Sequence, residues 1–206
     1  MKNILRLTLF LALFFPALAG AADAVLVRAS GEVQVRLKGS KVYGKAASGA
    51  QLKFGDWVQT LKRAKAHILF ANGSAILIKE STTVKLNGQL GKIYLNIPKG
   101  EFLIGVRKKL ARGQSFRVRT PSAVAAVRGT LFWGLSDDNL NSTYASFKDS
   151  IQITAQGKSI LLSPGEKSFI PYGKAPGKKE PSGISPDFMD TFQVEGTIED
   201  LKDLIK

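Results

Sequence analysis

The chain has 206 residues, of which 44% are hydrophobic and 20 are glycine, so it is long enough for one domain with a sizeable core. It contains no cysteine and one histidine, which excludes disulfides, a lipidated cysteine and a cysteine-based metal site. Lys and Arg number 30 against 16 Asp and Glu, a formal net charge of +14, and such a balance favours an anionic partner.

The first 21 residues have the three parts of a secretory signal peptide. Lys2 and Arg6 are basic, Leu7 to Phe15 form an apolar run, and Ala19-Gly20-Ala21 offers small residues for cleavage. The apolar run is shorter than the about 20 residues that a membrane-spanning helix needs. We therefore expect a periplasmic or secreted protein that loses residues 1–21 and keeps no transmembrane span, with an uncleaved short anchor as the alternative.

From Val25 to Tyr172 the sequence is a series of short strand-like runs separated by glycine, asparagine or proline. The expected strands are 25–36, 66–70, 76–78, 93–97, 102–106, 116–120, 144–154 and 159–162. Turn signals about 8 to 12 residues apart are typical of an all-β sandwich, barrel or solenoid. The clearest turn is Asn72-Gly73, because both residue types tolerate a positive φ. The runs beside it are apolar on both faces, which is expected of strands lying between layers.

The segment from Phe116 to Trp133 combines a strand, a forced turn and a second apolar run. Residues 116, 118 and 120 alternate with Arg117 and Arg119, the period-two pattern of a strand with one dry and one wet face. Pro121 ends that strand. Further on, Arg128 is expected to tie turn carbonyls together, and Gly129 to permit a bulge.

Basic residues are concentrated in and just before this strand. The candidate site for an anion or a partner consists of Arg107, Lys108, Lys109, Arg112, Arg117 and Arg119. Six cations within 13 residues can form one positive patch. Two other interpretations stay open: the charge serves only solubility, or the acidic C-terminal segment lies against it.

Four segments, in this order, resemble the FecR-domain family: Gly49–Thr60, Ala66–Ser74, Lys99–Phe102, and the run from Phe116 through Arg128-Gly129-Thr130 to Trp133. Together they span about residues 25 to 135, and the sequence to about 172 continues in the same style. The resemblance implies an all-β module of bacterial envelopes and favours a solenoid-like stack of short strands over the other β architectures. It implies no reaction.

The resemblance also implies what a complete FecR regulator contains: a cytoplasmic segment that controls a sigma factor, one membrane-spanning helix, and a periplasmic part that senses an outer-membrane receptor. Here only Met1-Lys2-Asn3 precede the apolar run, and the residues after Gly173 do not resemble the receptor-contacting segment. We therefore expect a free-standing exported FecR-like domain over residues 22–172, and not the transmembrane regulator.

No residue pattern indicates an enzyme. His67 is flanked by apolar residues and is expected to be an ordinary strand residue, and no Gly-x-Ser-x-Gly elbow occurs. Asp56 and Glu166 are placed by glycine turns, and Asp56 is expected to fix its turn, whereas Asp137 and Asp138 are expected in a solvated loop. We expect no catalytic, cofactor-binding or metal-binding residues and no cofactor. The alternative function, in which the protein is an enzyme, is a hydrolase that uses His67.

The composition changes after Tyr172. Residues 173–185 are rich in lysine, proline and glycine and are expected to be a solvated linker that packs little. Residues 186–206 contain two short helix candidates, the first opened by Pro186 and the second by the capping pair Thr197 and Asp200.

These helix candidates are too short to be stable alone, so their apolar side chains need a cover. The candidate docking arm consists of Phe188, Phe192, Leu201 and Leu204. The arm either folds back onto the β domain or docks in a groove of a partner, and the sequence leaves both open.

The predicted function is that of a non-catalytic exported domain that binds or scaffolds a cell-envelope component, either a protein or an anionic polymer or lipid. The alternative is an accessory periplasmic sensor that relays a signal to a separate membrane regulator. Nucleic acid is not expected, because the protein is exported and no aromatic residue alternates with the basic ones along the patch.

Overall fold

The computed structural model describes residues 22–89, 91–106, 110, 112–127 and 129–184. The expected signal peptide, Arg107 to Lys109, Arg128 and the candidate docking arm lie outside these residues. The described part of the chain is built from β-strands and contains no helix, so the expected all-β fold is confirmed.

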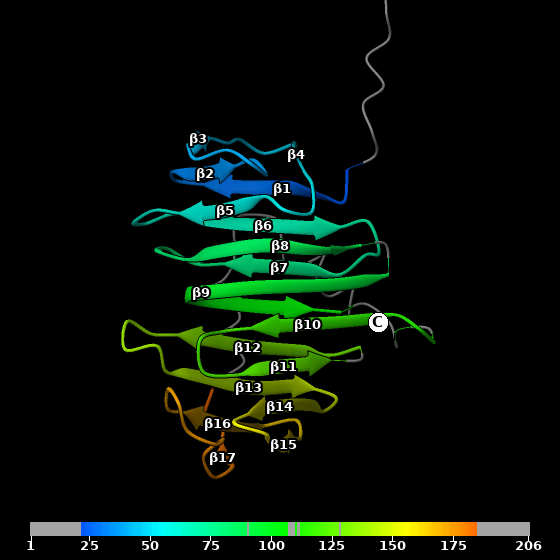
Figure 1. Cartoon of the computed structure of the whole chain (residues 1–206), viewed down its shortest axis with the longest axis vertical. Helices are drawn as coiled ribbons and strands as arrows, with labels where there is room; N and C mark the ends of the chain where they lie inside the picture. The colour runs from blue at the N-terminus through cyan, green and yellow to red at the C-terminus, as the bar shows by residue number, and fades with distance from the viewer. Residues whose placement is uncertain (1–21, 90, 107–109, 111, 128, 185–206) are drawn as a thin grey trace, which may run out of the picture.

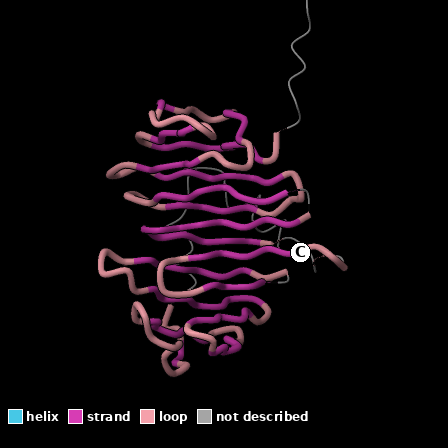
Figure 2. The backbone as a smooth tube through the Cα atoms, in the orientation of Figure 1, coloured by secondary structure: helices cyan, strands magenta, loops and turns pink. Residues whose placement is uncertain are grey.

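Seventeen strands follow one another along the described chain. Their bounds are β1 Ala24–Ser30, β2 Val33–Arg36, β3 Gly44–Lys45, β4 Ala50–Leu52, β5 Trp57–Thr60, β6 Lys65–Phe70, β7 Ala75–Ile78, β8 Thr83–Gln89, β9 Lys92–Gly105, β10 Ser115–Arg119, β11 Val124–Val127, β12 Leu131–Ser136, β13 Ser142–Lys148, β14 Ile151–Ala155, β15 Lys158–Leu162, β16 Glu166–Ile170 and β17 Glu180–Pro181. They lie across the long axis of the molecule, with the turns at their ends (Figures 1 and 2).

The strands form two layers that advance together from the N-terminal end to the C-terminal end (Figure 1). Layer A has the order β4-β1-β6-β7-β9-β12-β13-β16-β17. Layer B has the order β3-β2-β5-β8-β9-β10-β11-β14-β15. All of these pairings are antiparallel except β9 with β10, which is parallel. The fold is therefore a solenoid-like, two-layered stack of short strands.

Strand β9 belongs to both layers, although the sequence pattern predicts two separate strands there. Its first half pairs with β8 and β10 in layer B, and its second half pairs with β7 and β12 in layer A. Gly100 has a φ of 113°, and an added Cβ would lie 2.2 Å from the Thr82 hydroxyl, which accepts the N–H of Glu101 at 3.0 Å. A residue without a side chain lets the strand pass from one layer to the other without a break.

Two expected strands are each divided in the structure. The run 25–36 is interrupted at Gly31, which has a φ of 72°, and the run 144–154 is interrupted at Asp149, which has a φ of 55°. In both places the positive φ turns the chain from layer A to layer B. The Asn72-Gly73 hairpin between β6 and β7 is confirmed, with a φ of 81° at Gly73.

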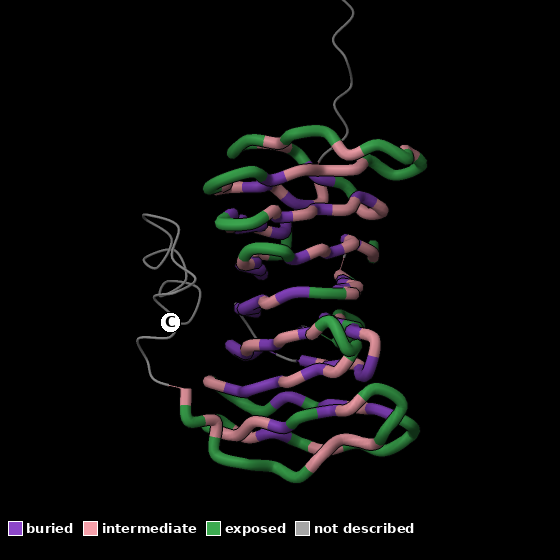
Figure 3. The backbone as a smooth tube through the Cα atoms, turned by 90° about the vertical axis from the view of Figure 1, so that its left-hand side faces the viewer, coloured by how far each residue is buried: buried purple, intermediate pink, exposed green. Residues whose placement is uncertain are grey.

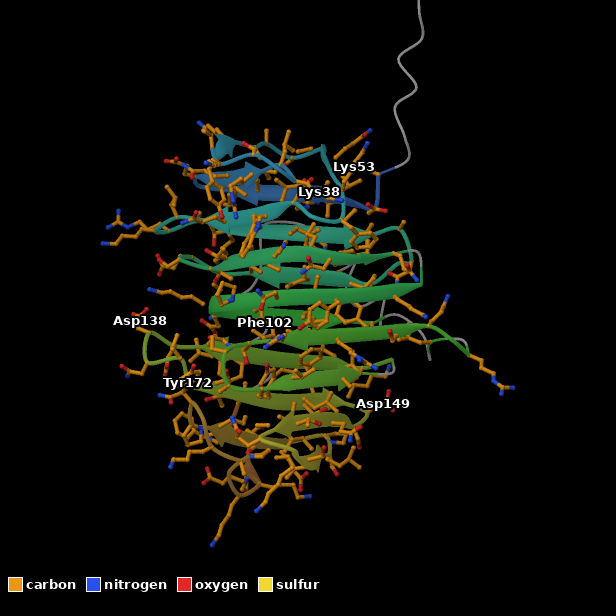
Figure 4. The ribbon with its side chains drawn as sticks, viewed as in Figure 1. Lys38, Lys53, Phe102, Asp138, Asp149 and Tyr172 are labelled. Carbon is orange, nitrogen blue, oxygen red and sulfur yellow. The ribbon has the colours of Figure 1, made fainter. Side chains whose placement is uncertain are left out.

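The core lies between the layers, where each strand contributes every second side chain. The Phe102 ring, which lies in the middle of the stack in Figure 4, meets Phe132 and Tyr144 edge-on at centroid distances of 6.4 and 6.3 Å. Burial raises the pKa of Tyr144 far above its usual range, and its hydroxyl lies 2.9 Å from that of Thr120. Buried segments fill the middle of the stack, and exposed ones lie mostly at its ends (Figure 3).

The described part of the expected linker, residues 173–184, is exposed or half-exposed throughout, but its backbone is hydrogen-bonded to the domain. Its short strand β17 pairs with β16. The N–H of Gly177 donates to Phe169 O at 3.0 Å, and the N–H of Ser182 donates to Gly165 O at 2.7 Å. The physical reason is that β16 would otherwise be an edge strand with unpaired backbone groups, and this segment covers them.

The Glu166 carboxylate connects this segment to the domain through a hydrogen bond and an ion pair, and the protonation of this carboxylate depends on pH. Its Oε2 accepts the N–H of Ser163 at 2.7 Å, and its carboxylate pairs with Lys179 Nζ at 3.1 Å. The hydrogen bond from Ser163, with the smaller effect of Lys179, holds the pKa of Glu166 below its ordinary value of 4.5. Because the charged form is favoured, this stabilisation is present above the ordinary carboxyl pKa and is lost as the pH falls through the lowered pKa.

We therefore expect the Glu166→Gln variant to melt below the wild type at neutral pH, with a difference that shrinks as the pH falls to about 3. Thermal unfolding across this range measures the difference. The exposed Glu180→Gln variant is the control and should follow the wild type. A difference between wild type and Glu166→Gln that is constant with pH would contradict the assignment.

Candidate functional site

Strand β10 has the predicted alternation. Phe116 and Val118 are buried in the core, whereas Arg117 and Arg119 are exposed on the outer face of layer B. Arg112 is also exposed, in the turn before this strand. Of the six predicted cationic residues, these three are described by the structure.

The strand register places residues from distant parts of the sequence beside Arg117 and Arg119. In one row across five strands, direct neighbours are Arg36 on β2, Trp57 on β5, Lys85 on β8, Asn96 on β9 and Arg119 on β10. A shorter row beside it contains Asn87, Tyr94 and Arg117. We call these eight residues the cationic stripe. With strands about 4.8 Å apart, the longer row extends about 19 Å.

The stripe combines cations with aromatic rings. The Arg36 guanidinium carbon lies 5.0 Å from the Trp57 ring centroid and 5.3 Å from that of Tyr43, and Lys85 Nζ lies 5.5 Å from the Trp57 centroid. Each such contact at an exposed site contributes about 0.5–1 kcal/mol and fixes the position of the cation. The sequence showed no aromatic residue alternating with basic ones along the chain, but the sheet creates this alternation across its strands.

At its N-terminal end the stripe opens into a pocket of about 400 Å³. The lining residues are Arg36, Leu37, Lys38, Gly39, Ser40, Phe54, Gly55, Trp57, Lys85 and Asn87. Three of them are basic and none is acidic, so the pocket favours an anionic group.

Asp56 fixes the two loops that form the wall of this pocket. It is buried, and its two carboxylate oxygens accept the N–H groups of Lys38 at 2.8 Å and Lys53 at 2.9 Å. Both lysines lie near the N-terminal end of the stack (Figure 4). Gly55 has a φ of 109°, and a Cβ there would lie 2.6 Å from the Lys38 side chain. The expectation that Asp56 fixes a turn is confirmed.

The other residues that the sequence analysis singled out lie within strands, turns or loops of the fold. His67 is a buried residue of β6 on the outer face of layer A. Asp137 is not merely solvated, since its Oδ1 accepts the N–H groups of Asn139 and Asn141, each at 2.9 Å. Asp138 is exposed and pairs with Lys99. Gly129, with a φ of 80°, lies at the corner where the chain passes from β11 in layer B to β12 in layer A.

Two further properties concern the described residues only. Within them, no three or more His, Cys, Asp or Glu residues gather in a way that could hold a metal ion. Over the same ranges, no helix has the length and apolar character needed to cross a membrane.

Comparisons with known proteins agree with this fold. The family model described as FecR protein matches residues 56–153. Crystal structures of a candidate anti-sigma factor from Parabacteroides distasonis, at 2.50 and 1.65 Å resolution, each superimpose with a TM-score of 0.54 at 14% sequence identity, covering 61% of this chain and 59% of the other. At this identity the likeness concerns the fold, and the chain spans a little more than half of that protein. The comparison with curated proteins found no match.

Residues 56–153 therefore match the FecR family, and the resemblance that the turn-and-strand motifs indicated is confirmed. The matched residues begin at Asp56 and contain every residue of the cationic stripe except Arg36. Sequence reasoning missed Arg36, Trp57 and Lys85. Their alternation with buried neighbours could have shown that each points away from the core, but not that they share one row.

The role of Asp56 leads to a stability prediction. Asp56→Ala leaves two backbone N–H groups without their charged acceptor and should lower the free energy of unfolding by about 2–4 kcal/mol. Urea unfolding at neutral pH measures this loss. Asp138→Ala removes an exposed carboxylate and should change the value by less than about 0.5 kcal/mol. Equal effects of the two substitutions would show that Asp56 does not fix the loops.

Proposed function

We propose that this protein is a non-catalytic, exported FecR-domain protein of an envelope sensing or signalling system, and that it binds an anionic envelope polymer through the cationic stripe. Export is inferred from the signal-like residues 1–21. The regulatory context is inferred from the FecR match and from the fold shared with a candidate anti-sigma factor.

The observation that supports the binding role is the arrangement of the stripe. Four cations, Arg36, Lys85, Arg117 and Arg119, project from one face of layer B, and neither row of the stripe includes an acidic side chain. Trp57 and Tyr94 lie among them and offer flat surfaces for sugar rings. Cations spaced over about 19 Å suit the repeating charges of an extended phosphorylated glycan.

A lipid surface fits this face less well. Membrane-binding surfaces pair basic residues with apolar side chains that enter the acyl region. The two rows of the stripe contain cations, amides and the half-buried Trp57 and Tyr94, but no exposed aliphatic side chain. We therefore favour the glycan and treat vesicle binding as the competing outcome.

The proposal predicts salt-dependent binding of the phosphorylated core oligosaccharide of delipidated lipopolysaccharide. The triple substitution Arg36→Gln, Lys85→Gln and Arg119→Gln should weaken binding about tenfold, since three exposed charge pairs contribute about 0.5 kcal/mol each. Calorimetry or fluorescence anisotropy at low and physiological salt measures the affinity.

The matched control removes the same charge from the C-terminal end of the stack. Lys158, Lys174 and Lys178 are exposed there, and their combined replacement by glutamine should leave binding nearly unchanged. Equal weakening by both triple substitutions, or affinity that does not change with salt, would refute a specific stripe. Binding to phosphatidylglycerol vesicles without binding to the oligosaccharide would assign the face to lipid instead.

A second candidate function is that of an accessory sensor that relays a cue to a separate membrane regulator. The observation that favours it is the fold shared with a candidate anti-sigma factor. Crosslinking in intact cells distinguishes the two, because the sensor predicts capture of the periplasmic segment of an inner-membrane protein, whereas the binding module predicts capture of envelope glycan.

A further inference from the structure

The outer face of layer A carries a second apolar cluster, separate from the core between the layers. Its buried members are Ala75, Leu77, Leu103 and Leu131, and the half-buried Leu69, Trp133 and Phe147 pack against them. We call these seven residues the layer A cluster.

The register shows that this cluster is continuous across the strands. His67, Leu77, Leu103, Trp133 and Ala145 are successive neighbours on β6, β7, β9, β12 and β13. The residues between them in sequence, such as Ile76, Ile104 and Phe132, point to the opposite face and fill the main core. The cluster is therefore on the side of layer A that faces away from layer B.

The burial of this face is the decisive observation. Leu77 and His67 are each 2% exposed, Leu103 is 1% exposed and Leu131 is 3% exposed. Side chains stand roughly perpendicular to a sheet, so neighbours within the same sheet, such as Trp133 and Phe147, cover the flank of a leucine more than its tip. Every described strand belongs to layer A or layer B, and none of them lies over this face. The described strands therefore do not account for the burial of this face.

We propose that the C-terminal segment, residues 186–206, packs across the layer A cluster with its apolar side chains. The segment has the composition that this face requires, since it contains Phe188, Phe192, Leu201 and Leu204 at helical spacing. Burying them and the cluster together removes apolar surface of both from water.

Charge complementarity supports this occupant. Residues 186–206 contain six acidic side chains and two lysines. The register places Arg28, Lys65 and Lys167 around the cluster, and Lys79 lies beside Glu101. The acidic residues of this face in the described strands are Glu101 and Glu180. Glu101 is engaged by Lys79 at 2.8 Å and by Trp133 Nε1 at 3.0 Å, and Glu180 is the direct neighbour of Lys167. An acidic segment is therefore attracted to the border of the cluster.

The last described residues also lie close enough to the layer A cluster for residues 186–206 to reach it. Ser182 is hydrogen-bonded to Gly165 at the start of β16, and β16, β13, β12 and β9 are successive strands of layer A. Three strand spacings amount to about 15 Å, a distance that 22 residues cover easily. A tethered segment also has an effective concentration of the order of millimolar, so it binds this face before a second copy does.

The two tryptophans of the chain give a direct test. Trp57 lies on layer B and Trp133 belongs to the layer A cluster, so Trp57→Phe leaves Trp133 as the sole tryptophan. In this background, ending the chain after Ile184 should move the Trp133 emission to longer wavelength and increase its quenching by acrylamide. A peptide of residues 185–206, but not its scrambled form, should reverse both effects.

A second variant keeps the full chain. Leu201→Glu with Leu204→Glu should expose Trp133 as the shortened chain does, whereas Leu201→Met with Leu204→Met, which preserves apolar character, should not. Circular dichroism of each variant reports whether the β fold is intact. An unchanged Trp133 spectrum in the glutamate variant, or an exposure that depends on protein concentration, would overturn the proposal, and the latter result would assign the face to a second copy of the chain.

Discussion

Strand β9 is hydrogen-bonded in both layers, and the remaining strands are arranged outward from it. Its first half presents Tyr94 and Asn96 to the outer face of layer B, and its second half presents Glu101 and Leu103 to the outer face of layer A. The crossing depends on Gly100, where a side chain would collide with Thr82. One close approach between backbone and side chain therefore fixes the relative position of the two layers and, through them, of both outer faces.

The two outer faces have opposite character, and this difference separates their roles. The outer face of layer B carries the exposed Arg117 and Arg119 beside half-exposed cations held by the Trp57 ring, an arrangement that leaves charge available to an outside ligand. The face of layer A buries leucines almost completely, which is the property of an internal interface. A partner that recognises charge and a segment that covers apolar surface can therefore occupy the same domain without competing.

Sequence patterns predicted those features of the fold that depend on residues adjacent in the chain. The all-β class, the Asn72-Gly73 hairpin and the outward direction of Arg117 and Arg119 follow from turn chemistry and period-two alternation. What depends on contacts between distant segments was missed. The row that joins Arg36 to Arg119 is created by strand register, which no local pattern specifies. The continuity of β9 was missed because Pro98 and Gly100 have the local character of a turn.

The positive surface follows from where the chain places its carboxylates. Asp56 and Asp137 accept backbone N–H groups in turns, and Asp23 accepts the N–H of Phe54 at 2.7 Å. Glu166 does the same for Ser163, and Glu80 for Arg63. Each carboxylate used in this way is directed at the backbone, where it stabilises a corner of the stack. The cations cannot take this role, since they donate hydrogen bonds and cannot accept the N–H groups that these corners leave free. These five carboxylates therefore hold their negative charge at corners of the stack, and the flat outer face of layer B keeps its positive charge.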